Sequence, residues 1–417
     1  MNKALKTLNL AWAERLEPYY YKVIGGIERR KAKKKIEELN PYIVGITGSC
    51  GKSTATKLLS EMLAKGYAEP VYAGLGNNSK RWVYRSLRKL NRNRQIVVQE
   101  ISGGEPGYLD YLVADVPLDI AVLTTIGGDH ISAFKSEDAI LAEKSKLLDA
   151  LKPEGVACLN IDDPHLARLA AENKRNIGLI SYGRAADAAV RAEIVSADWK
   201  SRLCFTLYVE GKSYPVKTRF VGTVLLTSIL AALAAIHAKG LPLEPAIAAL
   251  ADIEPMKNHM SIHKTASGQH LLMDAFKAPY WATKLFAADL SEMKNGKLVV
   301  VLGQISDTGN TGSRAYRQIM REIAPHCQMI IGVDGAFRAA DKLKGTLGDC
   351  EIVASNDIHE VHKLISAQND ALIVVKSGRR SKLWRLYEMT QAPIDCKIMP
   401  CQLVTGCSEC PSLRPKN

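Results

Sequence analysis

One short stretch near the start of the chain, IVGITGSCGKSTATKLLSEML at residues 43–63, constrains the fold more than any other. It begins as a β-branched apolar run, continues through a glycine-rich turn and ends in a helical pattern of apolar residues. A strand that leads through such a turn into a helix is the first part of a βαβ unit. The stretch therefore predicts an α/β domain built on a parallel sheet.

The turn itself predicts a phosphate-binding loop. Gly48 and Gly51 let the backbone wrap around an anion, and the following helix directs its first N–H groups and its dipole toward that anion. By residue type, Lys52 would reach the β- and γ-phosphates of a nucleoside triphosphate, and Ser53 would ligate Mg²⁺. The strict G-x-x-x-x-G-K-[ST] pattern is not met, because Ile46 occupies its first glycine position. A glycine turn without a ligand is the alternative.

Further β-branched runs alternate with helical patterns along the chain. The first series is YIVGIT, QIVVQEI, DIAVLTTI and GVACLNI. Residues 192–220 then alternate like a pair of antiparallel strands, with EGK as a turn. A second series begins near residue 270 with HLLMDAF, KLVVVLGQI, QMIIGV, CEIVAS and ALIVVKSG. We expect an α/β fold in which a P-loop domain with a mostly parallel sheet precedes a smaller, Rossmann-like α/β domain.

The same patterns predict four regions. Residues 1–42 form a basic helical segment, 43–258 the P-loop domain, 259–392 the second α/β domain and 393–417 a cysteine-rich tail. The hinge between the two α/β domains is expected around residues 254–265.

The net charge of +13 is concentrated at one end of the chain. Residues 1–95 hold 20 Lys and Arg against seven Glu and no Asp, whereas the remaining residues hold 36 of each sign. This basic excess predicts an anionic surface or a protein partner at the N-terminal segment, and a solvated helix face is the alternative. No nucleic-acid partner is expected.

The longest apolar run, FVGTVLLTSILAALAAIHAKG at residues 220–240, is interrupted by Thr and Ser and lacks an aromatic belt, so we expect a buried helix rather than a membrane span. The first forty residues lack the apolar core and cleavage site of a signal peptide. Scattered cysteines fit a reducing compartment. We therefore expect a cytoplasmic protein, with peripheral attachment to a membrane as an option.

Two further segments place ionisable side chains directly after predicted strands. VVQEISGG puts Glu100 at the end of an apolar run, and LTTIGGDH puts Asp129 and His130 just after another. Because ligands of open α/β sheets bind beyond the carboxyl ends of the strands, Glu100 and His130 are expected near Ser53. The alternative for His130 is an ordinary loop histidine.

Together these segments resemble the Mur ligase family, the ATP-dependent enzymes that add amino acids to peptidoglycan precursors, over residues 43–386. GITGSCGKST is similar to the ATP loop of the family, GNNSKR (76–81) to the loop after it, and QEISGG to its metal-binding strand. GGDHISAFKSEDAILAEKSKLL resembles the histidine loop and the helix with a special lysine, and LNIDDP (159–164) a further signature. VVVLGQISDTG and VVKSGRRS look most like the ligase that adds D-Ala-D-Ala.

The resemblance implies a ligase that joins a carboxylate to an amine through an acyl phosphate and releases ADP and phosphate. Lys52, His130 and Lys144 are the implied catalytic residues, with Lys144 at the position of the carbamylated lysine of the family and Lys146 as the alternative. The implied magnesium ligands are Ser53, Glu100, His130 and Lys144. The implied ATP-binding residues are Gly48, Ser49, Gly51, Lys52, Ser53, Thr54, Asn78, Asn160, His259 and Asp274.

The chain departs from the family pattern at several positions. VLLTS (224–228) replaces the adenine-contacting H-N-x-x-N, His259 replaces an arginine, and MDAFKAP (273–279) keeps Asp274 but has Lys277 and Pro279 instead of asparagines. Only about forty basic residues precede the loop, where peptidoglycan ligases have a uridine-nucleotide-binding domain and poly-γ-glutamate ligases have a short segment. A substrate other than the UDP-linked precursor is therefore expected.

The tail holds Cys396, Cys401, Cys407 and Cys410 in the pattern C-x₄-C-x₅-C-x₂-C. Four thiolates can hold Zn²⁺, whereas a redox pair or free thiols are the alternatives.

For the chain as a whole, two main classes of function remain open. The first is the ATP-dependent ligase, and the second is a non-catalytic, nucleotide-binding subunit with the same fold. A P-loop kinase or nucleic-acid motor is the third and weakest option.

Overall fold

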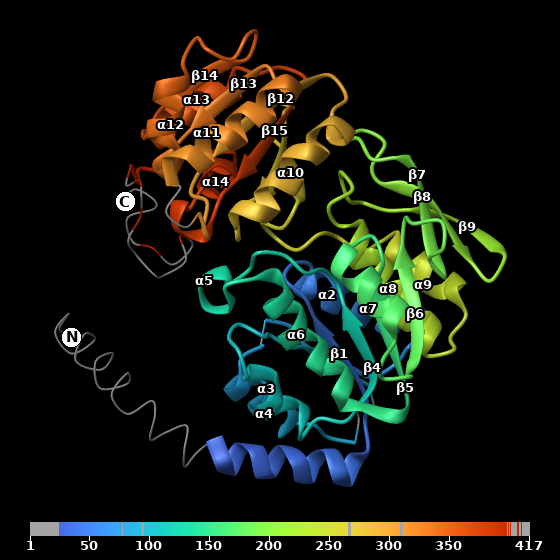
Figure 1. Ribbon diagram of the computed structural model, residues 1–417. Helices are drawn as coiled ribbons and strands as arrows, with labels where there is room; N and C mark the ends of the chain where they lie inside the picture. The colour runs from blue at the N-terminus through green and yellow to red at the C-terminus, as the bar shows by residue number, and fades with distance from the viewer. Residues whose placement is uncertain are drawn as a thin grey trace. The chain divides into compact units, whose positions relative to one another are not determined.

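The computed structural model describes residues 25–76, 78–92, 96–265, 268–308 and 312–397, together with Met399, Cys401, Cys407 and Cys410. By their internal contacts the described residues form two compact units (Figure 1). The first unit comprises those within Met1–Ile126, Ser136–Val190 and Ser228–Ala249. The second comprises those within Gly127–Lys135, Arg191–Thr227 and Leu250–Asn417.

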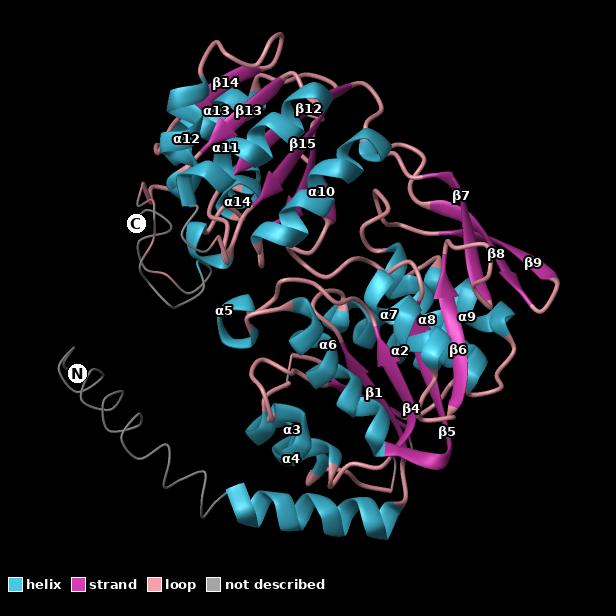
Figure 2. Cartoon of the chain, viewed as in Figure 1, coloured by secondary structure: helices cyan, strands magenta, loops and turns pink. Residues whose placement is uncertain are grey.

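The first unit is a parallel sheet whose strands are joined by helices (Figure 2). Its strands run in the order β2-β3-β1-β4-β5-β6, and each neighbouring pair is parallel. The strand bounds are β1 (Tyr42–Thr47), β2 (Val71–Gly74), β3 (Ile96–Glu100), β4 (Leu118–Leu123), β5 (Leu151–Asn160) and β6 (Gly178–Gly183). The helix bounds are α2 (Lys52–Tyr67), α3 (Lys80–Leu87), α4 (Tyr108–Val113), α6 (Glu137–Ser145), η1 (Lys146–Ala150) and α7 (Pro164–Glu172).

The central strands of this unit form where β-branched residues are buried on both sides of the sheet. Every residue of β1 from Ile43 to Thr47 is buried, as is every residue of β3. Continuous apolar runs of this kind are typical of parallel strands covered by helices on both faces. The four strand runs that the sequence predicted for this unit are therefore confirmed.

A helix over residues 25–39 precedes β1 and packs on the first unit. Ala32 and Ile36 are buried, and the buried carboxylate of Asp115 forms ion pairs with Arg29 and Lys33. Part of the basic charge of this segment is thus neutralised within the protein. An anionic partner at this end stays a prediction, and residues 1–24 lie outside the described residues.

The apolar run at residues 220–240 forms helix α8 (Leu226–Ala238), followed by α9 (Leu243–Leu250). Its residues from Ile229 to Ile236 are each at most 2% exposed, so the prediction of a buried helix is confirmed. Within the described residues, no helix is long and apolar enough to span a bilayer.

The second unit contains a hairpin and a separate sheet. Strands β8 (Cys204–Val209) and β9 (Lys212–Lys217) pair antiparallel around Glu210 and Gly211. Both turn residues have positive φ, 50° and 75°, which is typical of a two-residue type I′ hairpin turn. The predicted turn is confirmed. Strand β7 (Val190–Ser196) and the short helix α5 (Ile131–Phe134) complete this part of the chain.

The separate sheet has the order β10-β11-β15-β12-β13-β14, in which β10 and β11 are antiparallel and the other pairs parallel. Its strands are β10 (Ser261–Lys264), β11 (His270–Asp274), β12 (Lys297–Leu302), β13 (Met329–Gly332), β14 (Glu351–Ala354) and β15 (Ala371–Lys376). Its helices are α10 (Tyr280–Met293), α11 (Gly312–Ile323), η3 (Ala324–His326), η4 (Asp334–Ala336), α12 (Phe337–Leu343), α13 (Ile358–Ser366), η5 (Arg379–Ser381) and α14 (Arg385–Gln391). The predicted α/β fold class is confirmed.

A buried carboxylate in α10 makes the stability of the second unit depend on pH. Asp289 accepts hydrogen bonds from Thr223 N at 2.8 Å, from Thr223 Oγ1 at 2.6 Å and from Val224 N at 3.1 Å. Burial raises the pKa of Asp289 to about 6 despite these bonds, which act in the opposite direction. The folded state therefore binds this proton more tightly than the unfolded chain.

We expect this stabilisation to be complete below about pH 4 and to be lost as the pH rises through 6. Between pH 5 and pH 7.5 the loss amounts to about 1 kcal/mol. The Asp289→Asn variant removes the titrating group, so its melting temperature should vary less with pH than that of the wild type over this range. Identical pH profiles of melting temperature for the two proteins would contradict this assignment.

Candidate active site

The strand order of the first unit places several predicted residues at one edge of the sheet. Strand β1 lies between β3 and β4, and the register pairs Ile46 with Glu100 and Thr47 with Leu123. The carboxyl ends of these strands are therefore level. The loops that follow them must lie beside one another at this edge.

The loop after β1 is held in the shape of a phosphate cradle. Lys52 Nζ donates a hydrogen bond to the backbone oxygen of Gly48 at 2.5 Å, so the lysine folds back across the loop. Gly48 has φ +147°, and a Cβ there would lie 2.0 Å from Thr124 Oγ1. Gly51 has φ +83°, and a Cβ there would lie 2.7 Å from Ser228 Oγ. Larger residues would be both strained and obstructed at these two positions.

Helix α2 begins in this loop with its first N–H groups directed outward. Gly51 is the N-cap residue, and among the described residues no side chain caps the helix. Its first turn, which includes Lys52, Ser53 and Thr54, contains no acidic residue. Backbone donors without a side-chain cap, together with the positive end of the helix dipole, suit a bound phosphate group. The residues present thus fit the phosphates of a nucleotide.

Three side chains that the sequence analysis missed brace this loop. Ser49 N donates to Thr125 O at 2.7 Å, and Cys50 N donates to Thr125 Oγ1 at 3.1 Å. Thr124 Oγ1 donates to the backbone oxygen of Cys50. Ser228 Oγ donates to the backbone oxygen of Gly51 at 3.2 Å. The two threonines directly follow the apolar run of β4, so their position at the end of a strand could have identified them as site residues from the sequence.

Glu100 lies at the carboxyl end of β3 and accepts hydrogen bonds from two segments, the start of α2 and the loop between β2 and α3. Ser53 Oγ donates to Glu100 Oε2 at 2.9 Å, Asn78 Nδ2 donates to Oε1 at 2.8 Å, and Gly76 N donates to Oε2 at 3.0 Å. Glu100 is only 2% exposed. In the described part of the chain these donors are all neutral. A buried carboxylate without a cationic partner is costly, so the site favours a bound cation.

The chemistry of these donors suits Mg²⁺. Carboxylate and hydroxyl oxygens are hard ligands, and Mg²⁺ in nucleotide sites is held by one or two protein oxygens together with phosphate oxygens. Ser53 Oγ and Glu100 Oε2 are already in contact with each other at 2.9 Å. The structure therefore brings Ser53 and Asn78 onto Glu100, so the expected proximity of Glu100 and Ser53 is found, whereas the expected proximity of His130 stays a prediction.

The two candidate lysines of helix α6 have different surroundings. Lys144 is 1% exposed, and its Nζ donates to the backbone oxygen of Gly103 at 3.4 Å, in the loop that follows Glu100. Lys146 forms ion pairs with Asp110 at 2.8 Å and with Glu143 at 3.0 Å near the surface. These pairs raise the pKa of Lys146, chiefly through the hydrogen bond with Asp110. Burial beside the Glu100 loop thus distinguishes Lys144 from Lys146.

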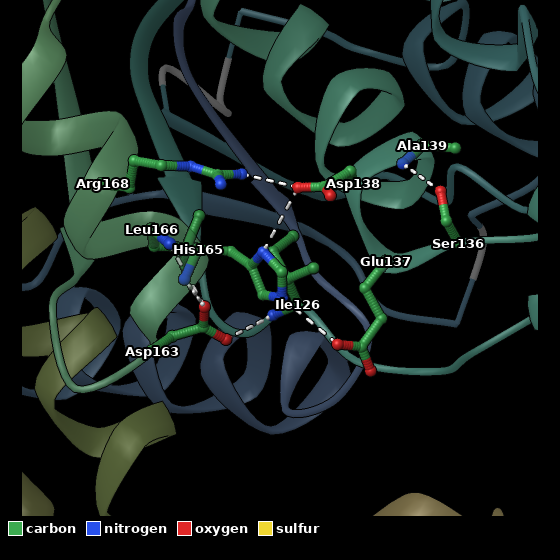
Figure 3. Close-up of polar contacts among 9 residues, drawn as sticks. All are labelled: Ile126, Ser136, Glu137, Asp138, Ala139, Asp163, His165, Leu166 and Arg168. Carbon is green, nitrogen blue, oxygen red and sulfur yellow. Dashed lines mark hydrogen bonds and ion pairs between the residues drawn. The ribbon is translucent and has the colours of Figure 1, made fainter.

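Asn160 ends strand β5, and its side chain is engaged within the protein. Its Nδ2 donates to Thr124 O at 2.8 Å, and its Oδ1 accepts from Asp162 N at 3.1 Å. The neighbouring Asp163 is the N-cap residue of α7 and also accepts a hydrogen bond from Ile126 N (Figure 3). Asn160 therefore holds the chain at Thr124, directly after β4, and Asp163 holds it two residues further on, at Ile126.

Three predicted residues belong to the second unit. His130 lies in segment Gly127–Lys135 with φ +56°, its side chain is 48% exposed, and its Nε2 lies 3.6 Å from Asp129 Oδ1. His259 packs on Phe276 with ring centroids 4.5 Å apart. Asp274 forms an ion pair with the buried Lys376. Their parts in nucleotide or metal binding stay predictions.

The prediction of a zinc site in the tail is not supported. Cys396 and Cys407 are buried with Ile394, and Arg385 Nη1 donates to Cys396 Sγ at 3.2 Å. Among the described residues, which include all four tail cysteines, no group of three or more His, Cys, Asp or Glu side chains is arranged to hold a metal ion. Two of the thiols pack in an apolar cluster instead, which the cysteine spacing could not distinguish from a metal site.

Comparison with known proteins identifies relatives of this chain. Residues 46–236 match the family model described as the Mur ligase middle domain. The UDP-N-acetylmuramoyl-tripeptide--D-alanyl-D-alanine ligase of Bacillus subtilis is 26% identical over 378 residues, which cover 87% of this chain and 79% of that protein. The enzyme of the same name from Mycobacterium bovis is 29% identical over 237 residues, which cover 57% of this chain and 46% of that protein.

Solved structures agree with these relatives. MurF from Acinetobacter baumannii has a TM-score of 0.76 at 22% identity, covering 88% of this chain and 80% of that chain. MurF from Thermotoga maritima, determined in complex with ADP, has a TM-score of 0.75 at 18% identity, covering 88% and 83%. At these identities the structures establish the fold. Residues 46–236 thus match the middle domain of the Mur ligases, and most of the chain is similar in sequence and in fold to ligases of this kind.

Proposed function

We propose that this protein joins a carboxylate to an amine through an acyl phosphate, using ATP, and that its carboxylate substrate differs from the standard UDP-linked peptidoglycan precursor. The observation that carries the proposal is the buried Glu100 carboxylate, whose neutral donors include Ser53 of the phosphate loop. A Mg²⁺ bound with the nucleotide would neutralise this charge. The metal ion would also offset charge on the phosphates during transfer.

In this mechanism the loop residues bind and orient the triphosphate. The backbone N–H groups at the start of α2 hold phosphate oxygens, and Lys52 moves from the Gly48 oxygen onto the β- and γ-phosphates. The substrate carboxylate then attacks the γ-phosphorus, and ADP leaves. The resulting acyl phosphate has a good leaving group, so the amine attacks its carbonyl carbon and phosphate departs. Lys52 compensates charge that accumulates during phosphoryl transfer.

Lys144 is proposed to act as a carbamate that adds a negative ligand beside the Glu100 loop. Its burial beside the loop that follows Glu100 supports this role, because a carbamate there would be an anionic oxygen ligand of the kind that Mg²⁺ prefers. The Lys144→Ala variant should lose at least about 100-fold in turnover, the scale of one preorganised charge-stabilising group. Short carboxylic acids such as acetate should restore part of the activity.

Bicarbonate should also raise the activity of wild-type protein prepared without carbon dioxide. The Lys146→Ala variant is the control and should keep its turnover, because Lys146 pairs with Asp110 at the surface. Wild-type activity in Lys144→Ala, or loss of activity in Lys146→Ala alone, would move the assignment to Lys146.

The proposal of a different carboxylate is supported by the segment that leads into β1. There, the helix over residues 25–39 packs on the first unit and its Arg29 is paired with Asp115. Several relatives are named for UDP-N-acetylmuramoyl peptides. These peptides should be tested first as carboxylate substrates, and we expect them to be poor substrates.

A non-catalytic, nucleotide-binding subunit is the second candidate. It is favoured by Ser228, which stands in the altered adenine motif and hydrogen-bonds to Gly51 of the loop. Such a protein would bind ATP or ADP without using a carboxylate or an amine.

Phosphate release separates the two candidates. ATP and Mg²⁺ are supplied, and pools of carboxylates are combined with pools of amino acids and small peptides. Release that requires both a carboxylate and an amine supports the ligase, and mass spectrometry then identifies the amide. Tight nucleotide binding without stimulation by any pool would establish the non-catalytic subunit and reject the ligase.

A further inference from the structure

One buried carboxylate of the first unit connects helix α7 to the backbone of Ile126, the residue before the segment that carries His130. Asp163 is 8% exposed and is the N-cap residue of α7. Its Oδ1 accepts from His165 N at 2.9 Å and from Leu166 N at 3.2 Å. Its Oδ2 accepts from Ile126 N at 2.7 Å. The same side chain therefore caps α7 and holds the backbone at the residue where segment 127–135 begins.

Helix α7 also holds the residues that follow that segment (Figure 3). His165 Nε2 lies 3.2 Å from Glu137 Oε2, and Arg168 Nη2 donates to Asp138 Oδ1 at 2.6 Å. Glu137 and Asp138 form the first turn of α6, which is capped by Ser136. These contacts lie on the helix that carries Lys144.

The contacts differ in strength because they differ in exposure. The side chains of Arg168 and Asp138 are 54% and 70% exposed, and exposed ion pairs contribute little. The bond from Ile126 N to Asp163 is buried, so removal of its acceptor leaves a backbone donor without a partner. Asp163 is therefore the principal anchor, and His165 and Arg168 are secondary.

The chain leaves the first unit after Ile126 and returns to it at Ser136. The segment between them carries His130, whose backbone has φ +56°. Both ends of the segment are thus attached to one short helix. A loop whose ends are held in this way samples fewer conformations, and so it presents its side chains more reproducibly.

We infer that Asp163 is a positioning residue for His130: it fixes the start of segment 127–135 through Ile126 N, while α7 fixes the other end at α6. This inference rests on the proposed ligase function for its catalytic consequence. Its structural part, the anchoring of the segment, does not depend on that function. Asp163 itself takes no part in the chemistry.

The Asp163→Asn variant separates the two tasks of this side chain. Asparagine caps helices as well as aspartate does, so its single amide oxygen can keep the bonds to α7. Its amide nitrogen is then directed at Ile126 N, another donor, and the anchor is lost. Asp163→Ala removes both tasks. Asp357 is the matched control, because it caps α13 through His359 N at 2.9 Å and lies in another part of the fold.

Hydrogen exchange measured by mass spectrometry tests the anchor directly. Amides of residues 126–135 should exchange at least about tenfold faster in Asp163→Asn and Asp163→Ala than in the wild type. Asp357→Ala should change exchange only around α13. Unchanged exchange at residues 126–135 in both Asp163 variants would overturn the anchor, whatever the protein catalyses.

Kinetics test the catalytic consequence. In both Asp163 variants kcat should fall about 10- to 100-fold while the Kd for ADP with Mg²⁺ stays within about threefold, because Asn160 still holds Thr124 beside the phosphate loop. Asp357→Ala should retain both values. Faster exchange together with unchanged kcat would overturn the positioning role. If the wild type itself releases no phosphate with any substrate pool, the proposed function has failed, and the exchange result still decides the anchor.

Discussion

Replacement of Lys52 by alanine is expected to reduce ADP formation by at least about 1,000-fold, the upper range for loss of one charge-stabilising group. Lys52 is the cation of the phosphate loop, and its Nζ already contacts the loop at the Gly48 oxygen. Alanine keeps the helix, because it has the highest helix propensity. The variant should therefore melt near the wild-type temperature while it loses turnover and most of its affinity for ATP.

Lys65→Ala is the control for this experiment. Lys65 lies in the last turn of the same helix, is 49% exposed and pairs with Glu61 at 3.0 Å. An exposed pair of this kind contributes less than about 1 kcal/mol, so this variant should keep full activity. Turnover near the wild-type rate in Lys52→Ala would refute the assignment of Gly48–Ser53 as the nucleotide loop.

Replacement of Glu100 by glutamine is expected to have the second large effect. Glutamine has nearly the same size but no charge, so it cannot offer Mg²⁺ an anionic ligand. The wild type should be stabilised by ADP only when Mg²⁺ is present, and this dependence should disappear in Glu100→Gln. Turnover should fall at least about 100-fold, and excess Mg²⁺ should restore little of it.

Asp115→Asn is the matched control, since Asp115 is another buried carboxylate of the first unit. It pairs with Lys33 at 3.1 Å and accepts a hydrogen bond from Tyr84 at 2.7 Å. This substitution should lower the melting temperature, because Arg29 and Lys33 lose their anionic partner, but should leave the Mg²⁺ dependence intact. A Glu100→Gln variant that is still stabilised by ADP in a Mg²⁺-dependent manner would place the metal site elsewhere.

Many strands of both units were predictable because their signals are local. KLVVVL and ALIVVK are continuous apolar runs, and as β12 and β15 they are central strands that are almost entirely buried. Strand β10 was not predicted, and its residues fell within the expected hinge. The run SIHK is short and polar, and it forms a strand by pairing antiparallel with β11. A pairing of this kind is not encoded in the pattern of the short strand alone.

The candidate site was predictable to a similar extent. Lys52, Ser53 and Glu100 were identified by residue type at a strand end or a helix start, and the structure places Ser53 and Glu100 in direct contact. Thr124 and Ser228 were missed as loop contacts. Each acts through one hydroxyl on a backbone oxygen, and such a bond leaves no periodic pattern in the sequence.

The sequence by itself determined the local structural features of this protein: the glycine turn, the lysine and hydroxyls at the start of α2, and the buried strands between helices. These follow from the conformational preferences of neighbouring residues and from the spacing of apolar side chains. The tertiary structure decided which of these features come into contact. Ser53 and Glu100 are 47 positions apart, and Ile126 and Asp163 are 37 apart. Their contacts exist because the order of the parallel strands brings the carboxyl ends of β1, β3, β4 and β5 to one edge, and the sequence pattern of any single strand does not contain that order.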